Sequence, residues 1–174
     1  MSKRKYSDPS KVELIIFDVD GVLTDGTINI NDDGSETKRF NVRDGFGIRL
    51  WLNAGYQIAI ITGRSGESLK HRVQSLKIDP DLVIQGSRDK SEALDVILEK
   101  TGVDVSNVAY LADDWPDLCA MTRVGYPMAV HDAEPEVVEV SAFVSSHKGG
   151  RGAARDAIAH LLRSKNLYEP IGVD

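Results

Sequence analysis

The sequence predicts an α/β fold in which a Rossmann-like parallel sheet is flanked by helices on both faces. Short apolar or β-branched runs recur along the chain, at residues 14–17, 58–61, 82–84, 108–111 and 127–130. Runs of this length are typical of buried strands. Helical patterns lie between them, and strands that alternate with helices form parallel sheets through right-handed crossovers.

The composition indicates one folded domain. The chain has 174 residues, of which 41% are hydrophobic and 28% are charged. A length of about 150 residues is usual for one domain, and these proportions are ordinary for globular proteins. We therefore expect a single domain over residues 1–174, with a frayed tail at residues 171–174.

Net charge and cysteine content restrict the partners and the compartment. There are 21 Lys and Arg against 27 Asp and Glu, which gives a net charge of −6. This sign opposes attraction to nucleic acid or to an anionic membrane, so we expect neither partner. The single cysteine, Cys119, cannot form an intrachain disulfide, and residues 1–11 lack the apolar stretch of a secretory signal. A cytoplasmic location fits best.

The predicted helices follow from caps and apolar spacing. The first stops at Gly55, and the second starts after Ser65 as N-cap. The third follows Asp89, with Glu92 three residues later as in a capping box. Two further helix candidates lie at residues 116–125 and 153–162.

One stretch departs from the alternation of strands and helices. Residues 27–40 form two short strand patterns around the turn at residues 32–35, which contains a glycine. Apolar side chains are sparse there, namely Ile28, Ile30 and Phe40. We therefore expect an inserted β-hairpin that projects from the core, and no separate cap domain.

Acidic side chains follow two of the predicted strands. Asp18 and Asp20 come directly after the first strand, and the fourth is followed by Asp113, Asp114 and Asp117. Aspartate after a strand often only makes a turn. Adjacent acids beside a buried strand repel one another, however, and a bound cation such as Mg²⁺ relieves that repulsion.

Groups suited to an anion follow the second and third predicted strands. Thr62, Gly63 and Arg64 come after the second strand, and Lys90 opens the helix after the third. Each signal is weak alone, but in a parallel sheet all four strand ends meet at one edge, where ligands bind. Such a site can bind Mg²⁺ and a phosphoryl group, with one ionised aspartate as nucleophile and a second carboxylate moving the proton.

The same residues carry a family resemblance. Their order resembles the four motifs of the haloacid dehalogenase superfamily of phosphatases, here Asp18-Val19-Asp20-Gly21, Thr62, Lys90 and Asp113-Asp114. Further segments resemble the capless 3-deoxy-D-manno-octulosonate 8-phosphate phosphatases, namely residues 18–26, 40–49, 60–64 and 149–152. The similarity spans roughly residues 12–163.

The resemblance implies a catalytic role for each motif. Asp18 would attack phosphorus and become an aspartyl-phosphate, and Asp20 would protonate the leaving sugar oxygen and then activate water. Thr62 and Lys90 would hold the phosphoryl oxygens, with a backbone amide from Gly63. The activity implied is phosphate-ester hydrolysis on the way to the core sugars of lipopolysaccharide.

The resemblance also implies ligands for metal and substrate. Asp18, the backbone carbonyl of Asp20, and Asp113 would ligate Mg²⁺, with Asp114 and Asp117 as supporting acids. The substrate would carry a carboxylate, and we expect Arg64 and a neighbouring subunit's Arg151 to pair with it.

The family's assembly is a tetramer, and we expect a homotetramer here. In the family the hairpin mediates association and neighbouring subunits close each active site. The projecting hairpin at residues 27–40 suits that role, because its strand edges would be an aggregation hazard in a monomer.

One position departs from the family pattern. The last motif usually begins with glycine, and this chain has Ala112 there. If that position needed a positive φ or the absence of a side chain, alanine would cost about 1 kcal/mol or more and could displace the metal ligands. We expect the alanine to be tolerated.

Three alternatives stand beside the leading interpretation. A phosphatase for a nine-carbon keto-sugar acid phosphate would use identical motifs. A phospho-aspartate receiver domain also has acids, a Thr and a Lys at one sheet edge, but its acidic pair lies on the first strand, whereas Asp113-Asp114 comes last here. A non-catalytic oligomerisation module would not need all four motifs.

Overall fold

Six parallel strands form one sheet in the computed structural model, which describes residues 5–168. Their order is β5-β4-β1-β6-β7-β8. The bounds are β1 (Leu14–Phe17), β4 (Gln57–Ile61), β5 (Val83–Ile84), β6 (Val108–Ala112), β7 (Tyr126–Ala129) and β8 (Phe143–Val144). The tail predicted to fray, residues 171–174, lies outside the described residues.

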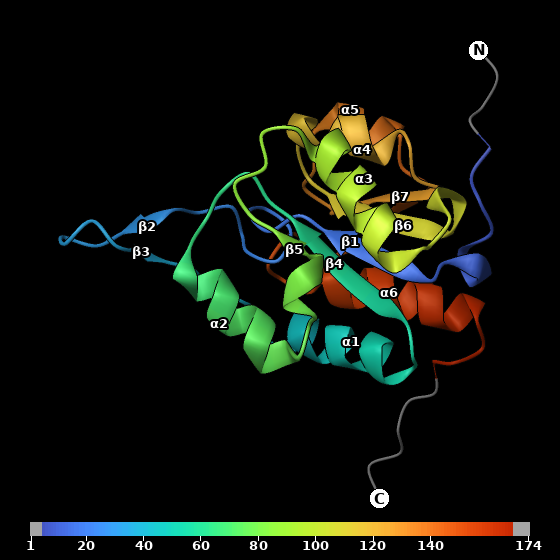
Figure 1. Cartoon of the computed structure of the whole chain (residues 1–174), viewed down its shortest axis with the longest axis horizontal. Helices are drawn as coiled ribbons and strands as arrows, with labels where there is room; N and C mark the ends of the chain where they lie inside the picture. The colour runs from blue at the N-terminus through green and yellow to red at the C-terminus, as the bar shows by residue number, and fades with distance from the viewer. Residues whose placement is uncertain (1–4, 169–174) are drawn as a thin grey trace, which may run out of the picture.

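Helices cover both faces of the sheet (Figure 1). On one face lie α1 (Val42–Asn53), α2 (Glu67–Leu76) and α6 (Ala153–Ser164), and on the other lie α3 (Lys90–Thr101), α4 (Leu118–Met121) and α5 (Pro135–Glu139). Successive side chains of a strand point to opposite faces. Ile15 and Phe17 of β1 accordingly pack in the first core, while Leu14 and Ile16 pack in the second. The predicted α/β class is confirmed.

The boundaries differ from the prediction in a few places. Short 3₁₀ turns precede several elements: η1 (Pro9–Lys11), η2 (Pro80–Leu82), η3 (Val105–Asn107) and η4 (Trp115–Asp117). Asp89 caps α3 as predicted, because its carboxylate accepts the N–H groups of Ser91 and Glu92. The predicted Ser65 cap is wrong: the N-cap of α2 is Gly66, whose N–H is bound by the side chain of Gln85.

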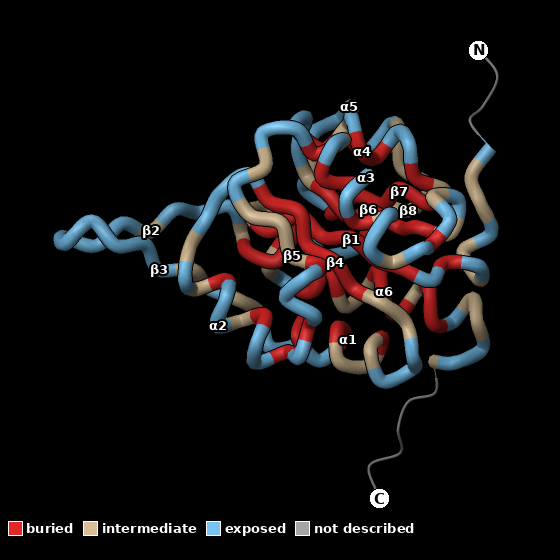
Figure 2. The backbone as a smooth tube through the Cα atoms, viewed as in Figure 1, coloured by how far each residue is buried: buried red, intermediate tan, exposed pale blue. Residues whose placement is uncertain are grey.

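The hairpin is shorter than the sequence pattern indicates. β2 (Asn29–Ile30) pairs with β3 (Glu36–Thr37) in antiparallel register, and the N–H of Asn31 donates to the carbonyl of Ser35 across the turn. Figure 2 shows this segment extending away from the body of the protein with an exposed surface. Ile28 and Ile30 are 51% and 70% exposed. The hairpin therefore projects, as predicted.

The strand order creates a switch point beside β1. From β1 the chain fills the sheet outward through β4 and β5, and it then returns to the other side of β1 to form β6, β7 and β8. At such a point the loops after neighbouring strands diverge and leave a crevice at the carboxyl ends. The ends of β1, β4 and β6 therefore position the site.

Candidate active site

A buried lysine links two aspartates at the end of the central strands. Asp18 directly follows β1, and Lys90 is the first residue of α3. The Nζ atom of Lys90 lies 2.8 Å from Oδ1 of Asp18 and 2.7 Å from Oδ1 of Asp117. All three side chains are buried. Although burial opposes its charge, the two carboxylates raise the pKa of Lys90 above its ordinary value.

Three carboxylates meet around this lysine. Asp18, Asp113 and Asp117 each offer an oxygen within 4.8 Å of the others. Oδ1 of Asp113 is buried and has no hydrogen-bond partner among the described residues. Burial, with the negative charges of Asp18 and Asp117, raises the pKa of Asp113 to about 8. The single charge of Lys90 does not balance three acids, and carboxylate oxygens are what Mg²⁺ prefers. These residues therefore fit a magnesium ion.

The two predicted supporting acids lie in different places. Asp117 is buried within the cluster and accepts a 2.7 Å hydrogen bond from the hydroxyl of Tyr110, besides its bond from Lys90. Asp114 is exposed, and its carboxylate accepts the N–H of Trp115, which caps η4. Only Asp117 is therefore placed to support the cluster directly.

Thr62 brings a buried hydroxyl to the same edge. It directly follows β4, and β4 pairs with β1 so that Ile60 lies opposite Phe17. Its carbonyl accepts the N–H of Ser87 at 3.1 Å, which ties the loop after β4 to the loop after β5. Gly63, the next residue, is exposed and presents its backbone to solvent.

The base of the hairpin reaches this edge, which the sequence analysis did not foresee. Lys38 forms an ion pair with Asp20, and Glu36 forms one with Arg64. Residues 36 and 38 share one face of an extended strand. The only sequence signal is that alternation of one acid and one base, which is common on solvated hairpins.

Glycines allow the loops around the site to touch. A Cβ on Gly21 would lie 1.9 Å from Oδ2 of Asp113, and one on Gly149 would lie 1.6 Å from the carbonyl oxygen of Gly21. Gly150 donates its N–H to the carbonyl of Val22 at 2.8 Å. The glycine loop at residues 149–152 therefore packs on the loop that carries the first motif.

Arg151 lies at the rim of the same loop. Its side chain is 58% exposed and lies 3.1 Å from Oδ2 of Asp25. It is thus on the motif side of the molecule but outside the buried cluster.

Comparison with known proteins places the chain in a family. A family model for haloacid dehalogenase-like hydrolases matches residues 81–156. The 3-deoxy-D-manno-octulosonate 8-phosphate phosphatase KdsC of Escherichia coli K12 is 42% identical over 158 residues, which cover 91% of this chain and 83% of that protein. The KdsC phosphatase of Salmonella typhi is 42% identical over 169 residues, covering 97% and 89%.

The chain belongs to the 3-deoxy-D-manno-octulosonate 8-phosphate phosphatases. Solved structures of this phosphatase family agree in fold. The Yersinia pestis structure has a TM-score of 0.89 at 38% identity and covers 92% of this chain and 85% of its own. The Moraxella catarrhalis structure, a complex with magnesium, phosphate and KDO, has a TM-score of 0.88 at 37% identity and covers 91% and 90%.

The departure of Ala112 from the usual motif of this phosphatase family is tolerated in the backbone. Ala112 is the last residue of β6 and pairs with Ala129 of β7 in regular parallel register. Positive φ angles outside glycine occur only at Lys77 and Asn166 among residues 5–168. A strand conformation accepts alanine without strain.

Proposed function

We propose that this chain is a Mg²⁺-dependent phosphatase that hydrolyses 3-deoxy-D-manno-octulosonate 8-phosphate through a phosphorylated Asp18. The observation that carries the proposal is the buried Lys90 between Asp18 and Asp117, beside the unmatched carboxylate of Asp113. The substrate follows from the family, since relatives at 42% identity carry that activity in their names.

The first step forms the phosphoenzyme. A carboxylate oxygen of Asp18 forms a bond to phosphorus, and the bond from phosphorus to the sugar oxygen breaks. The electron pair of that bond stays on the sugar oxygen, which takes a proton from Asp20. Lys90 partly offsets the charge on Asp18, and the Thr62 hydroxyl, with the backbone amide of Gly63, holds phosphoryl oxygens.

The second step returns the enzyme to its starting state. Asp20, now a carboxylate, takes a proton from a water molecule whose oxygen forms a bond to phosphorus. The bond between phosphorus and the Asp18 oxygen breaks, its electron pair stays on Asp18, and phosphate leaves. One residue thus gives a proton in the first step and takes one in the second.

The metal would be held by two carboxylates that already lie close together and by one backbone carbonyl. Asp18, Asp113 and the backbone carbonyl of Asp20 would be its ligands, and Asp117 would orient Lys90 beside it. When bound, Mg²⁺ supplies positive charge that reduces the repulsion between the phosphoryl group and the acids.

The sugar acid would be recognised at the rim. Arg64 and Arg151 are exposed cations whose present partners are Glu36 and Asp25. Exposed ion pairs of this kind are worth about 1 kcal/mol or less. A substrate carboxylate can therefore replace an acidic partner at little cost.

The assembly and the compartment belong to the same proposal. The whole chain would form a single domain, and four copies would associate through the hairpin that exposes Ile28 and Ile30. We place the enzyme in the cytoplasm. Of the helices in residues 5–168, none combines the length and the apolar character that crossing a bilayer would need.

Kinetics with three phosphates test this function. We expect the specificity constant for the octulosonate 8-phosphate to exceed those for a nine-carbon keto-acid phosphate and for glucose 6-phosphate. EDTA should reduce turnover to background, because it removes Mg²⁺. Asp18→Asn should do the same, because an amide neither attacks phosphorus nor binds Mg²⁺ well. A higher constant for the nine-carbon substrate would reassign the substrate, and turnover by purified Asp18→Asn would exclude the covalent mechanism.

A further inference from the structure

Lys38 is an unusual residue in the hairpin. Most of residues 27–37 are exposed, yet the Lys38 side chain is only 10% exposed. A lysine is rarely buried unless its charge is paired, because desolvation of an ammonium is costly. Its partner is Asp20, which is 24% exposed and is the proton donor of the proposed mechanism.

Asp20 has few other contacts that fix its carboxylate. Oδ1 receives the hydrogen bond from Lys38, and Oδ2 is buried with no hydrogen-bond partner among residues 5–168. The backbone around it is well fixed, since the carbonyl of Val19 accepts the N–H groups of Val22, Leu23 and Thr24. The main chain thus sets where Asp20 is, and Lys38 sets where its carboxylate points.

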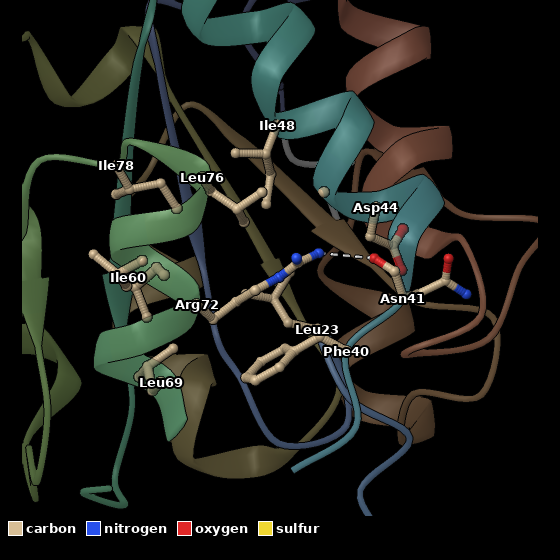
Figure 3. Close-up of a pocket in the computed structure, with 12 residues that line it drawn as sticks. Leu23, Phe40, Asn41, Asp44, Ile48, Ile60, Leu69, Arg72, Leu76 and Ile78 are labelled. Atoms are coloured by element: carbon tan, nitrogen blue, oxygen red, sulfur yellow. Dashed lines mark hydrogen bonds between the residues drawn. The ribbon is translucent and has the colours of Figure 1, made fainter. Parts of the chain in front are cut away.

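The hairpin can hold Lys38 in place because its second strand is anchored nearby. Arg72 of α2 donates a 3.0 Å hydrogen bond to the carbonyl of Asn41, and its guanidinium lies 5.6 Å from the ring of Phe40 (Figure 3). Gly45 allows this approach, because a Cβ there would lie 2.3 Å from the Arg72 nitrogen. Lys38 therefore lies only two residues before Phe40, which Arg72 holds in place.

We propose that Lys38 is a positioning residue: by donating to Oδ1 of Asp20, it leaves Oδ2 to carry the proton toward the leaving-group oxygen, so that the seating of the hairpin controls proton transfer. The proposal rests on the proposed function of Asp20. Proton transfer needs the donor within hydrogen-bond reach of the leaving oxygen, and small misplacements are expensive. The hairpin thus acts on the chemistry as well as on assembly.

Substrates with different leaving groups distinguish a positioning role of Lys38 from a merely structural role. A sugar alcohol leaves poorly without a proton, whereas p-nitrophenolate is stable enough to leave as an anion. The ratio kcat/KM reports the steps up to phosphorylation of Asp18, before water is activated. Misplaced Asp20 therefore lowers kcat/KM for alkyl phosphates and spares p-nitrophenyl phosphate.

The experiment measures kcat/KM with the octulosonate 8-phosphate, glycerol 3-phosphate and p-nitrophenyl phosphate. We expect Lys38→Met to lose about 30-fold or more on both alkyl phosphates, within the range for general acid catalysis, and about threefold or less on the aryl phosphate. Lys38→Arg should recover most of the loss, because it keeps the charge and the donor. Arg39→Met, which removes one charge from the adjacent exposed residue, should match the wild type.

Other outcomes would overturn the proposal. Equal loss on all three substrates, or no loss, would show that Lys38 does not act through Asp20. Loss confined to the octulosonate phosphate would make Lys38 a binding group for the substrate carboxylate. A wild type inactive on the octulosonate phosphate would refute the proposed function instead. The comparison of kcat/KM for glycerol 3-phosphate and p-nitrophenyl phosphate would still test the role of Lys38.

Discussion

The acidic cluster and the hairpin face both place charged groups at one sheet edge, but they do so by different means. In the cluster, Lys90 and its partners are buried and lie in the segments that follow parallel strands. On the hairpin face, Glu36 and Lys38 lie on a segment that projects from the sheet. The first arrangement depends on topology and the second on how a protruding element is seated. Substitutions in the two regions should therefore fail differently.

The largest effect should follow from removing the charge at the centre of the cluster. Lys90→Met leaves Asp18 and Asp117 buried without their cation. We expect kcat to fall about 10³-fold for every substrate. The free energy of unfolding should fall by about 3–5 kcal/mol. Steady-state kinetics and denaturant unfolding measure both. Lys70→Met, which removes an exposed lysine paired with Glu67, is the control and should change neither. Wild-type kcat in Lys90→Met would contradict the site assignment.

A smaller and more selective effect should follow from changing the hairpin. The double substitution Ile28→Lys and Ile30→Lys puts charges on the exposed apolar side chains. We expect monomers with activity on the sugar acid about tenfold lower and activity on p-nitrophenyl phosphate nearly unchanged, because the small substrate needs little closure of the site. Light scattering and kinetics check this. Val96→Lys, an exposed apolar position on α3, should leave the assembly intact. A fully active wild-type monomer would contradict the proposal that neighbouring subunits close each active site.

The smallest effect concerns a half-buried histidine outside both regions. His160 of α6 contacts the hydroxyl of Tyr126 at 2.8 Å and stacks on Phe143, and burial lowers its pKa below the ordinary 6.5. Below pH 6.5 the unfolded chain therefore binds more protons at this residue than the folded chain, and stability falls as the pH falls.

His160→Gln should weaken that dependence by some tenths of a kcal/mol between pH 7 and pH 5.5, since one unit of pKa is worth about 1.4 kcal/mol. Chemical denaturation at the two pH values gives the difference. An unchanged slope would show that other groups carry the acid sensitivity.

The sequence predicted the cluster well because topology alone brings strand ends together. Asp18, Thr62, Lys90 and Asp113 each lie within two residues of a strand end or at a helix start, so a correct strand order is enough to collect them. The elements α5 and β8 were not predicted, because five and two residues are too short to show a period.

The contacts of Lys38 and Asp114 could not be predicted in the same way. Lys38 reaches Asp20 from a hairpin whose end contacts Arg72, a residue more than thirty positions later in the chain. Asp114 turns outward because its carboxylate caps the next turn. Both outcomes depend on local packing that no periodic pattern encodes.

The contacts of Gly21 and Gly149 limit which substitutions these two positions can tolerate. Alanine is usually the mildest replacement, yet at residue 21 its methyl group would overlap the Asp113 carboxylate, and at residue 149 it would overlap the backbone of Gly21. An added carbon at residue 21 would displace the carboxylate of Asp113, a proposed metal ligand, and one at residue 149 would push against the loop that carries Asp18 and Asp20. A saturation screen should therefore find Gly21 and Gly149 to be as intolerant of substitution as Asp18.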